Sequence, residues 1–172
     1  MLAYRYMNMQ MDGMRQGSDR ASSGEVLTRG GYTVTPEWMT MDMHMFGLMY
    51  APTDQLTLML MVNYIETEME HSVRPLPPLV AAIGDDQFTT RSDGLGDLKL
   101  SALYRFYLKA NRKAHFGLGL SLPTGSIDAK DRTPRPGMPP TFQENQLPAS
   151  MQLGSGTIDL LPSLTYVQQF DS

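Results

Sequence analysis

The chain has 172 residues, with 14 basic and 18 acidic side chains, 15 methionines and no cysteine. The acidic balance disfavours a nucleic-acid binder because it offers phosphates no basic face, and the missing cysteines exclude disulfides and thiolate metal sites. No segment reaches the roughly 18 consecutive apolar residues of a membrane-spanning helix, whereas a strand of a membrane β-barrel needs only about 9–11 residues.

A period of two dominates the chain, and this period places successive side chains on opposite faces of a β-strand. In residues 2–11 and 39–50, Leu, Phe or Tyr on one face alternates mainly with Met on the other. In the segments after residue 55, aliphatic or aromatic residues alternate with smaller or more polar ones. Helical spacing explains none of these segments as well, so the sequence predicts an all-β protein. The predicted strands are residues 2–11, 39–50, 56–69, 97–107, 115–122 and 157–168.

The connections alternate in length. Those at residues 51–55 and 108–114 are short, and the three at about residues 12–37, 70–96 and 123–156 are long and are expected to lack regular structure. Short turns at one rim and long polar loops at the other are typical of outer-membrane barrels, and a compact soluble domain rarely holds three such loops. The sequence therefore predicts an antiparallel up-and-down transmembrane β-barrel, with residues 1–172 as a single barrel segment.

Aromatic side chains fall near strand ends on the apolar face, where they would form girdles at the membrane–water boundary. They are Tyr50, Tyr64, Tyr104, Phe106, Phe116 and Tyr166. The alternative is a soluble β-sandwich or lipocalin-like barrel whose aromatic residues face a dry core. Six strands are fewer than the roughly eight of the smallest membrane barrels, and we see neither a signal peptide nor a closing strand. We therefore expect a fragment, or one part of an oligomeric barrel, in a bacterial outer membrane.

Three segments together carry a family resemblance: Gly94-Leu-Gly-Asp-Leu98, Leu120-Ser-Leu-Pro-Thr-Gly-Ser-Ile127 and Gln152-Leu-Gly-Ser-Gly-Thr-Ile-Asp159. In this order they resemble the outer-membrane β-barrel proteins of the meta-pathway phenol-degradation family, which are described as transporters. The resemblance implies a Gram-negative outer-membrane barrel of about a dozen strands that passes small, often hydrophobic or aromatic, molecules.

The same motifs have a physical interpretation at the rim of the predicted barrel. Glycines permit backbone angles that other residues resist, so Gly94 and Gly96 are expected to return one long loop to a strand. Gly154 and Gly156 would do the same for another loop. Charged side chains on the inward face shape a polar passage or form a structural salt bridge, and both interpretations stay open. They are Asp97 and Asp159 near the rim, with Lys99 and Arg105 further down. His115 also faces inward, on another hairpin than Met43 and Met45.

The methionines share the inward face of the predicted strands, opposite Leu, Val and Tyr. If Tyr50 pairs with Leu56 across the short turn, Met45 stands opposite Met61, and their thioethers could touch. Three interpretations compete: a flexible greasy lining for apolar solutes, a site for a soft cation such as Cu(I) or Ag(I), or simple filling of the interior. The predicted lining residues are Met7, Met9, Met39, Met41, Met43, Met45, Met49, Met59 and Met61.

Nothing in the sequence resembles a nucleophile motif, and the histidines His44, His71 and His115 fall on different faces or loops. We predict no enzymatic activity, no committed metal site and no cofactor. The acidic run at Glu66, Glu68 and Glu70 is expected to be a solvated face. The expected function is an outer-membrane channel for small hydrophobic or aromatic molecules, in contact with lipid and lipopolysaccharide. The alternatives are a soft-metal-handling membrane protein and a soluble ligand-binding β module.

Overall fold

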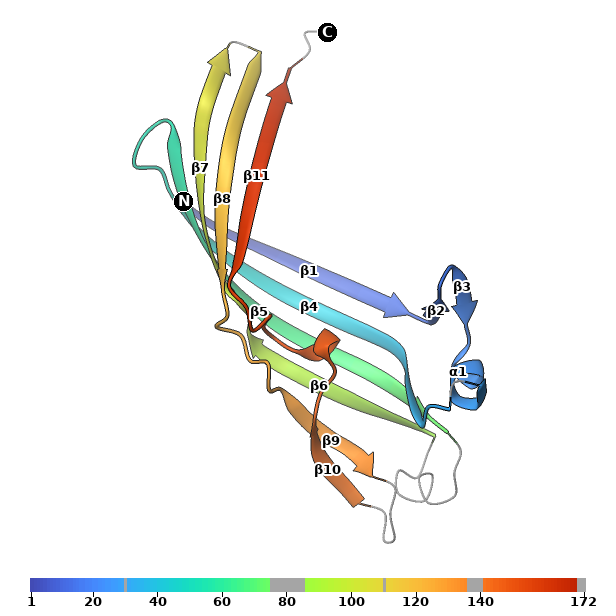
Figure 1. Ribbon diagram of the computed structural model, residues 1–172. Coiled ribbons are helices and arrows are strands. Elements are labelled where there is room, and N and C mark those ends of the chain that lie inside the picture. Colours follow the sequence, from blue (N-terminus) through green and yellow to red (C-terminus); the bar gives the residue numbers. More distant parts are fainter. Residues whose placement is uncertain (30, 75–85, 110, 136–140, 170–172) are drawn as a thin grey trace.

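The computed structural model describes residues 1–29, 31–74, 86–109, 111–135 and 141–169 (Figure 1). Nearly all regular structure in this part of the chain is β-strand. The helices among the described residues are short, and none of them is long and apolar enough to cross a membrane. In chain order the elements are β1 (Leu2–Asp12), β2 (Met14–Gln16), β3 (Asp19–Ala21), α1 (Ser23–Arg29), β4 (Val34–Tyr50), β5 (Leu56–Val73), β6 (Gln87–Leu95), β7 (Leu98–Lys109), β8 (Arg112–Leu122), β9 (Lys130–Arg135), β10 (Thr141–Gln146), the 3-10 turn η1 (Ala149–Met151) and β11 (Asp159–Gln168).

The main sheet is an antiparallel meander in the order β1-β4-β5-β7-β8-β11. Strand β5 is long enough to have two successive partners: its first half pairs with β7 and its second half with β6. Gly96 and Asp97 alone separate β6 from β7, so these two strands act as one long, interrupted strand. In Figure 1, β7, β8 and β11 run up the page while β1, β4 and β6 run across it. The all-β antiparallel up-and-down prediction is confirmed; within the described residues the sheet is open, with β1 and β11 at its edges.

Each of the six predicted strands is present, and several are longer than predicted. Strand β4 begins at Val34 rather than residue 39, β5 continues to Val73, and β8 begins at Arg112. The added residues include polar ones, such as Thr35 and Glu37 in β4, His71 and Ser72 in β5, and Arg112 and Lys113 in β8, so the apolar alternation fades although the strand continues. Strands β7 and β11 differ from their predicted bounds by one or two residues at each end where they differ at all.

The prediction that the three long connections lack regular structure is wrong. The first holds the β2–β3 hairpin and helix α1, where the Ser22 hydroxyl accepts a hydrogen bond from the backbone N–H of Glu25 as a helix cap. The second contains β6, and residues 75–85 of it, with several of its prolines, lie outside the described residues. The third contains the β9–β10 hairpin and η1. Polar residues make up most of these elements, so their sequences resemble loops.

The predicted register of the β4–β5 hairpin is also wrong. Tyr50 pairs with Leu58, not Leu56, so Met45 lies opposite Asn63 and Met61 lies opposite Gly47. The hairpin connection is longer than predicted, since β5 pairs with β4 only from Leu58 on, while Leu56 and Thr57 pair with β7 alone. Inside this turn the Thr53 hydroxyl accepts a hydrogen bond of 3.0 Å from the backbone N–H of Leu56.

Candidate functional site

One face of the main sheet, which we call the leucine face, is apolar and open. Directly paired residues of antiparallel strands share a face, so the strand registers define rows of side chains across the sheet. One row consists of six leucines from six strands. They are Leu2, Leu48, Leu60, Leu100, Leu120 and Leu160. Within the described residues nothing seals this face, since Leu164 is 73% exposed and Leu58 and Leu118 are also exposed.

Aromatic side chains border this leucine row on both sides. Towards the short turns lie the exposed rings of Tyr50, Tyr104, Phe106, Phe116 and Tyr166, and towards the long connections lie Tyr4, Tyr6, Phe46 and Tyr64. Along β5 the two borders are eight residues apart, from Leu56 to Tyr64, or roughly 27 Å. At the strand tilt of about 40° found in membrane barrels, this length spans about 21 Å, close to the apolar band of about 25 Å.

Beyond the Tyr6–Tyr64 border the leucine face becomes polar. The Tyr6 hydroxyl donates a hydrogen bond to Asp42, and the Tyr64 hydroxyl donates one of 2.8 Å to Asp93. Further along, the Trp38 indole N–H donates to Glu70, and the pair Arg91–Glu68 lies at 3.0 Å. The acidic run of β5 therefore occupies a solvated surface, as expected, and the ring hydroxyls join the apolar band to the polar zone.

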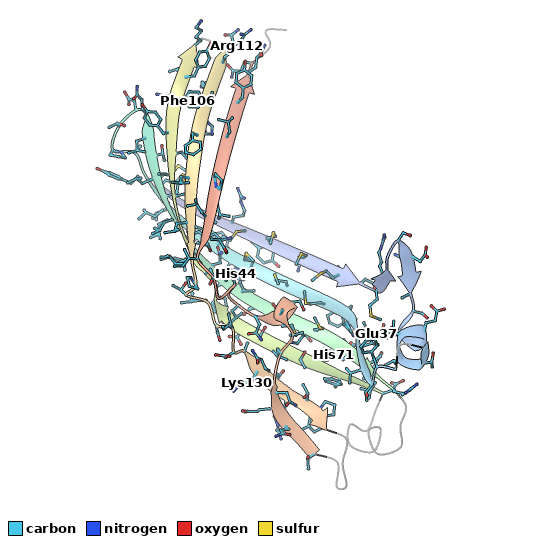
Figure 2. The ribbon with its side chains drawn as sticks, in the orientation of Figure 1. Glu37, His44, His71, Phe106, Arg112 and Lys130 are labelled. Atoms are coloured by element: carbon cyan, nitrogen blue, oxygen red, sulfur yellow. The ribbon has the colours of Figure 1, made fainter. Side chains whose placement is uncertain are left out.

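The opposite face of β1, β4 and β5 is lined by methionine, and we call it the methionine face. All eleven methionines of these three strands lie on it, and Figure 2 shows their sulfur atoms along β1 and β4. The registers place Met11, Met39 and Met69 in one row, then Met9, Met41 and Thr67, then Met7, Met43 and Ile65. A second group contains Met49 opposite Met59, with Met61 one row further along β5. Every predicted lining methionine lies on this face.

The long connection between β8 and β11 folds onto one end of the methionine face. Met151 of η1 is 0% exposed and packs with Met39, Met69 and Leu147. The Thr90 hydroxyl donates to its sulfur at 3.3 Å, and the Ser92 hydroxyl donates to its carbonyl at 2.7 Å. Met39 is therefore buried beneath a loop, while the methionines nearer the short turns keep partial exposure. Among the described residues, this connection thus covers one end of the methionine face.

Asp97 holds this connection against the main sheet. The carboxylate accepts backbone hydrogen bonds from Gly125 at 3.0 Å and from Ser155 at 2.8 Å. The Thr124 hydroxyl binds across the β6–β7 interruption, accepting from the N–H of Leu98 and donating to the carbonyl of Gly96. Residues from the three segments that carry the family resemblance thus meet at one place, which we call the Asp97 junction. The hydrogen-bond donors to Asp97 at this junction are backbone amides, a structural role that neither interpretation of this residue included.

Close backbone approach explains the glycines of the Asp97 junction. A Cβ atom on Gly125 would lie 2.6 Å from the carbonyl oxygen of Leu153, and one on Gly96 would lie 2.9 Å from the Ile65 side chain. Gly94 has a φ of +149°, which favours glycine. The prediction that Gly94 and Gly96 return a long loop to a strand is wrong, because they lie where β6 gives way to β7. Gly156, with a φ of +71°, does lie between a loop and β11.

The other predicted charged residues lie on β7, β8 and β11, on the same face of the sheet as the methionines. Lys99, Ser121 and Asp159 form one row, and Asp159 accepts a hydrogen bond of 2.9 Å from the Thr157 hydroxyl. Arg105 and His115 are paired six residues further down. The structure thus places the predicted charged residues on one face in two separate rows.

The three histidines lie apart. His44 is on the leucine face, where its Nδ1 lies 2.8 Å from the Tyr4 hydroxyl. His71 stacks on Phe88 with ring centroids 4.8 Å apart, on the same side of the sheet as the methionines. No three His, Asp or Glu side chains converge in a geometry suited to a metal ion in the described part of the chain.

The predicted lining residues leave out Met11 and Met69 of this face, and they leave out Met151, which packs in one cluster with Met69. Met69 continues the odd-numbered series of Met59 and Met61, so the alternation itself could have identified it. Met151 carries no such signal, since it lies in a short turn inside a long connection.

Comparison with known proteins adds no relative: no family model, curated protein or solved structure matches the chain.

Proposed function

We propose that the protein forms part of the wall of an outer-membrane β-barrel, and that small hydrophobic or aromatic molecules cross the membrane along its methionine face. The observation that carries this proposal is the layering of the leucine face. It has an exposed aliphatic row at mid-height, an aromatic border on each side and a spacing between the borders close to the height of the apolar band of membrane barrels. A soluble sheet would bury such a face against a second layer.

The alternation of short and long connections supports the same proposal and gives the orientation of the strands in the membrane. The turn at residues 51–55 and the paired strand ends Lys109 and Arg112 lie at one end of the sheet, and the long connections with their hairpins lie at the other. Outer-membrane barrels have short turns on the periplasmic side and long loops outside the cell. In this arrangement the polar zone around Asp42 and Asp93 faces the lipid headgroups and lipopolysaccharide.

The methionine face suits apolar solutes. Thioether side chains are unbranched and polarizable, so they adapt to ligands of different shape without forming one tight site. The connection held by the Asp97 junction covers part of this face and narrows the proposed passage. The resemblance of three segments to the meta-pathway phenol-degradation family agrees with this class of solute.

Planar-bilayer conductance of the full-length protein, with and without an aromatic solute such as phenol, tests the proposal. We expect discrete channels whose current the solute reduces, and we expect Met43→Arg to change the conductance. Tyr104→Phe, on the leucine face, is the control and leaves the conductance unchanged. The absence of pores and of solute uptake into liposomes would refute the transport proposal. Release of the protein from membranes by a carbonate wash would favour the soluble binding module.

A further inference from the structure

Four methionines on the neighbouring strands β1 and β4 form a compact array on the methionine face, next to the covered row of Met39 and Met69. Met7 lies directly opposite Met43, and Met9 lies directly opposite Met41. Directly opposed Cβ atoms are about 4.5–5.5 Å apart, and the two rows are separated by two residues, or about 7 Å along the strands. Flexible thioether side chains can converge from these positions on a single atom.

The array is accessible. Met7 is 39% exposed, and the other three side chains are half-buried. At one end the array is bounded by the row of Met39 and Met69, which Met151 covers. At the other end Arg5 lies opposite Met45. The array is therefore reached from the open side of the sheet and not from the buried cluster.

A polar atom at the edge of the array lacks a partner. Thr67 is opposite Met41 and only 4% exposed, and its hydroxyl has no hydrogen-bond partner among the residues that the structure describes. A buried hydroxyl without a partner costs about 1–3 kcal/mol, so an occupant that offers an interaction to its oxygen is favoured here. A hydrocarbon solute offers none, whereas a cation or its bound water does.

We propose that Met7, Met9, Met41 and Met43 bind a soft monovalent cation, Cu(I) or Ag(I), with the Thr67 hydroxyl at the edge of the site. Thioether sulfur is a soft ligand that selects such ions over Zn(II), Mg(II) and Ca(II). The segregation of side chains agrees with this assignment. Leucine fills the opposite face of the same strands, so apolarity alone does not account for methionine at every position of the array.

This site depends on the strand register and not on transport, so it stands or falls separately from the proposed function. The chemistry of its ligands also predicts how binding depends on pH. A thioether carries no proton to lose, so binding is independent of pH, unlike binding by histidine, cysteine or carboxylate. His44, the histidine nearest in sequence, lies on the other face and bonds to Tyr4.

Titration of the full chain in detergent micelles with Ag(I), which needs no reductant, tests the proposal. We expect tight binding that is equal at pH 5 and pH 7.5, and no competition from Zn(II). Met9→Leu with Met41→Leu, a nearly volume-conserving change, is expected to weaken binding by at least about tenfold. Met7→Leu with Met43→Leu is a second variant should the first fold poorly, as judged by circular dichroism.

The matched control is Met49→Leu with Met59→Leu, another directly opposed pair on the same face. We expect this control to keep the pH-independent site. Unchanged affinity in both array variants, equal loss in the array and control variants, or loss of binding at pH 5 in the wild type would each overturn the proposal. Transport of aromatic solutes without Ag(I) binding would refute this site alone.

Discussion

Leu100→Arg tests whether the leucine face contacts lipid. Leu100 is 39% exposed on β7, in the middle of the six-leucine row, two rows from the Tyr104 border. An arginine at the midplane of a membrane barrel costs about 2–4 kcal/mol, which corresponds to a roughly 30- to 700-fold loss in the folding equilibrium constant. We expect this loss in urea titrations of the protein folded into phospholipid vesicles, followed by fluorescence of the single tryptophan, Trp38.

Two matched variants separate membrane contact from a general effect of charge. Ser101→Arg places the same side chain at nearly the same height on the opposite face, where we expect a much smaller cost. Tyr104→Arg places it at the aromatic border, where the expected cost is about 0–1 kcal/mol. Equal effects of all three substitutions, or a Leu100→Arg variant as stable as the wild type, would refute a lipid-facing leucine surface.

Two further predictions concern the long connections and their ends. Gly125→Ala is expected to cost about 1–3 kcal/mol through overpacking at the Asp97 junction and to speed limited proteolysis within residues 123–158; Gly24→Ala, which has open space around it, serves as control. If Gly125→Ala leaves the cleavage rate unchanged, the junction does not hold the loop. Burial lowers the pKa of His71 below its usual value, so folding favours the neutral ring. The contribution of His71 to the free energy of unfolding should therefore be fully present above about pH 6.5. As the pH decreases below this value, the free energy of unfolding should decrease by at most about 1.4 kcal/mol per pH unit. His71→Leu should remove this part of the slope, and an identical slope in that variant would assign it to another group.

The alternation of side chains allowed the main strands to be predicted because the two faces of the sheet differ in chemistry along their whole apolar band. Where leucine and methionine alternate along a strand, the pattern assigns each side chain to one face of the sheet. The register of the β4–β5 hairpin was not predictable in this way. A shift of two residues leaves every side chain on its own face, so Leu56 and Leu58 satisfy the pattern equally well as partners of Tyr50.

The polar strands and the covering loop were missed for different physical reasons. In β6, Thr90 and Ser92 face the methionines while Arg91 and Asp93 face water, so both sides of the strand are polar and no apolar alternation appears. The Asp97 junction joins residues that are 28 and 58 positions apart. Such contacts depend on the completed topology, and a pattern confined to neighbouring residues does not contain them.

A surface built from thioethers can change its polarity without any change in sequence. Peroxide converts methionine to its sulfoxide, which is polar and is restored by dedicated reductases. Met7 and its half-buried neighbours are accessible to oxidants, whereas Met151 and the pair beneath it are shielded. Oxidation would thus make the accessible part of the methionine face polar, while the buried cluster around Met151 stays apolar.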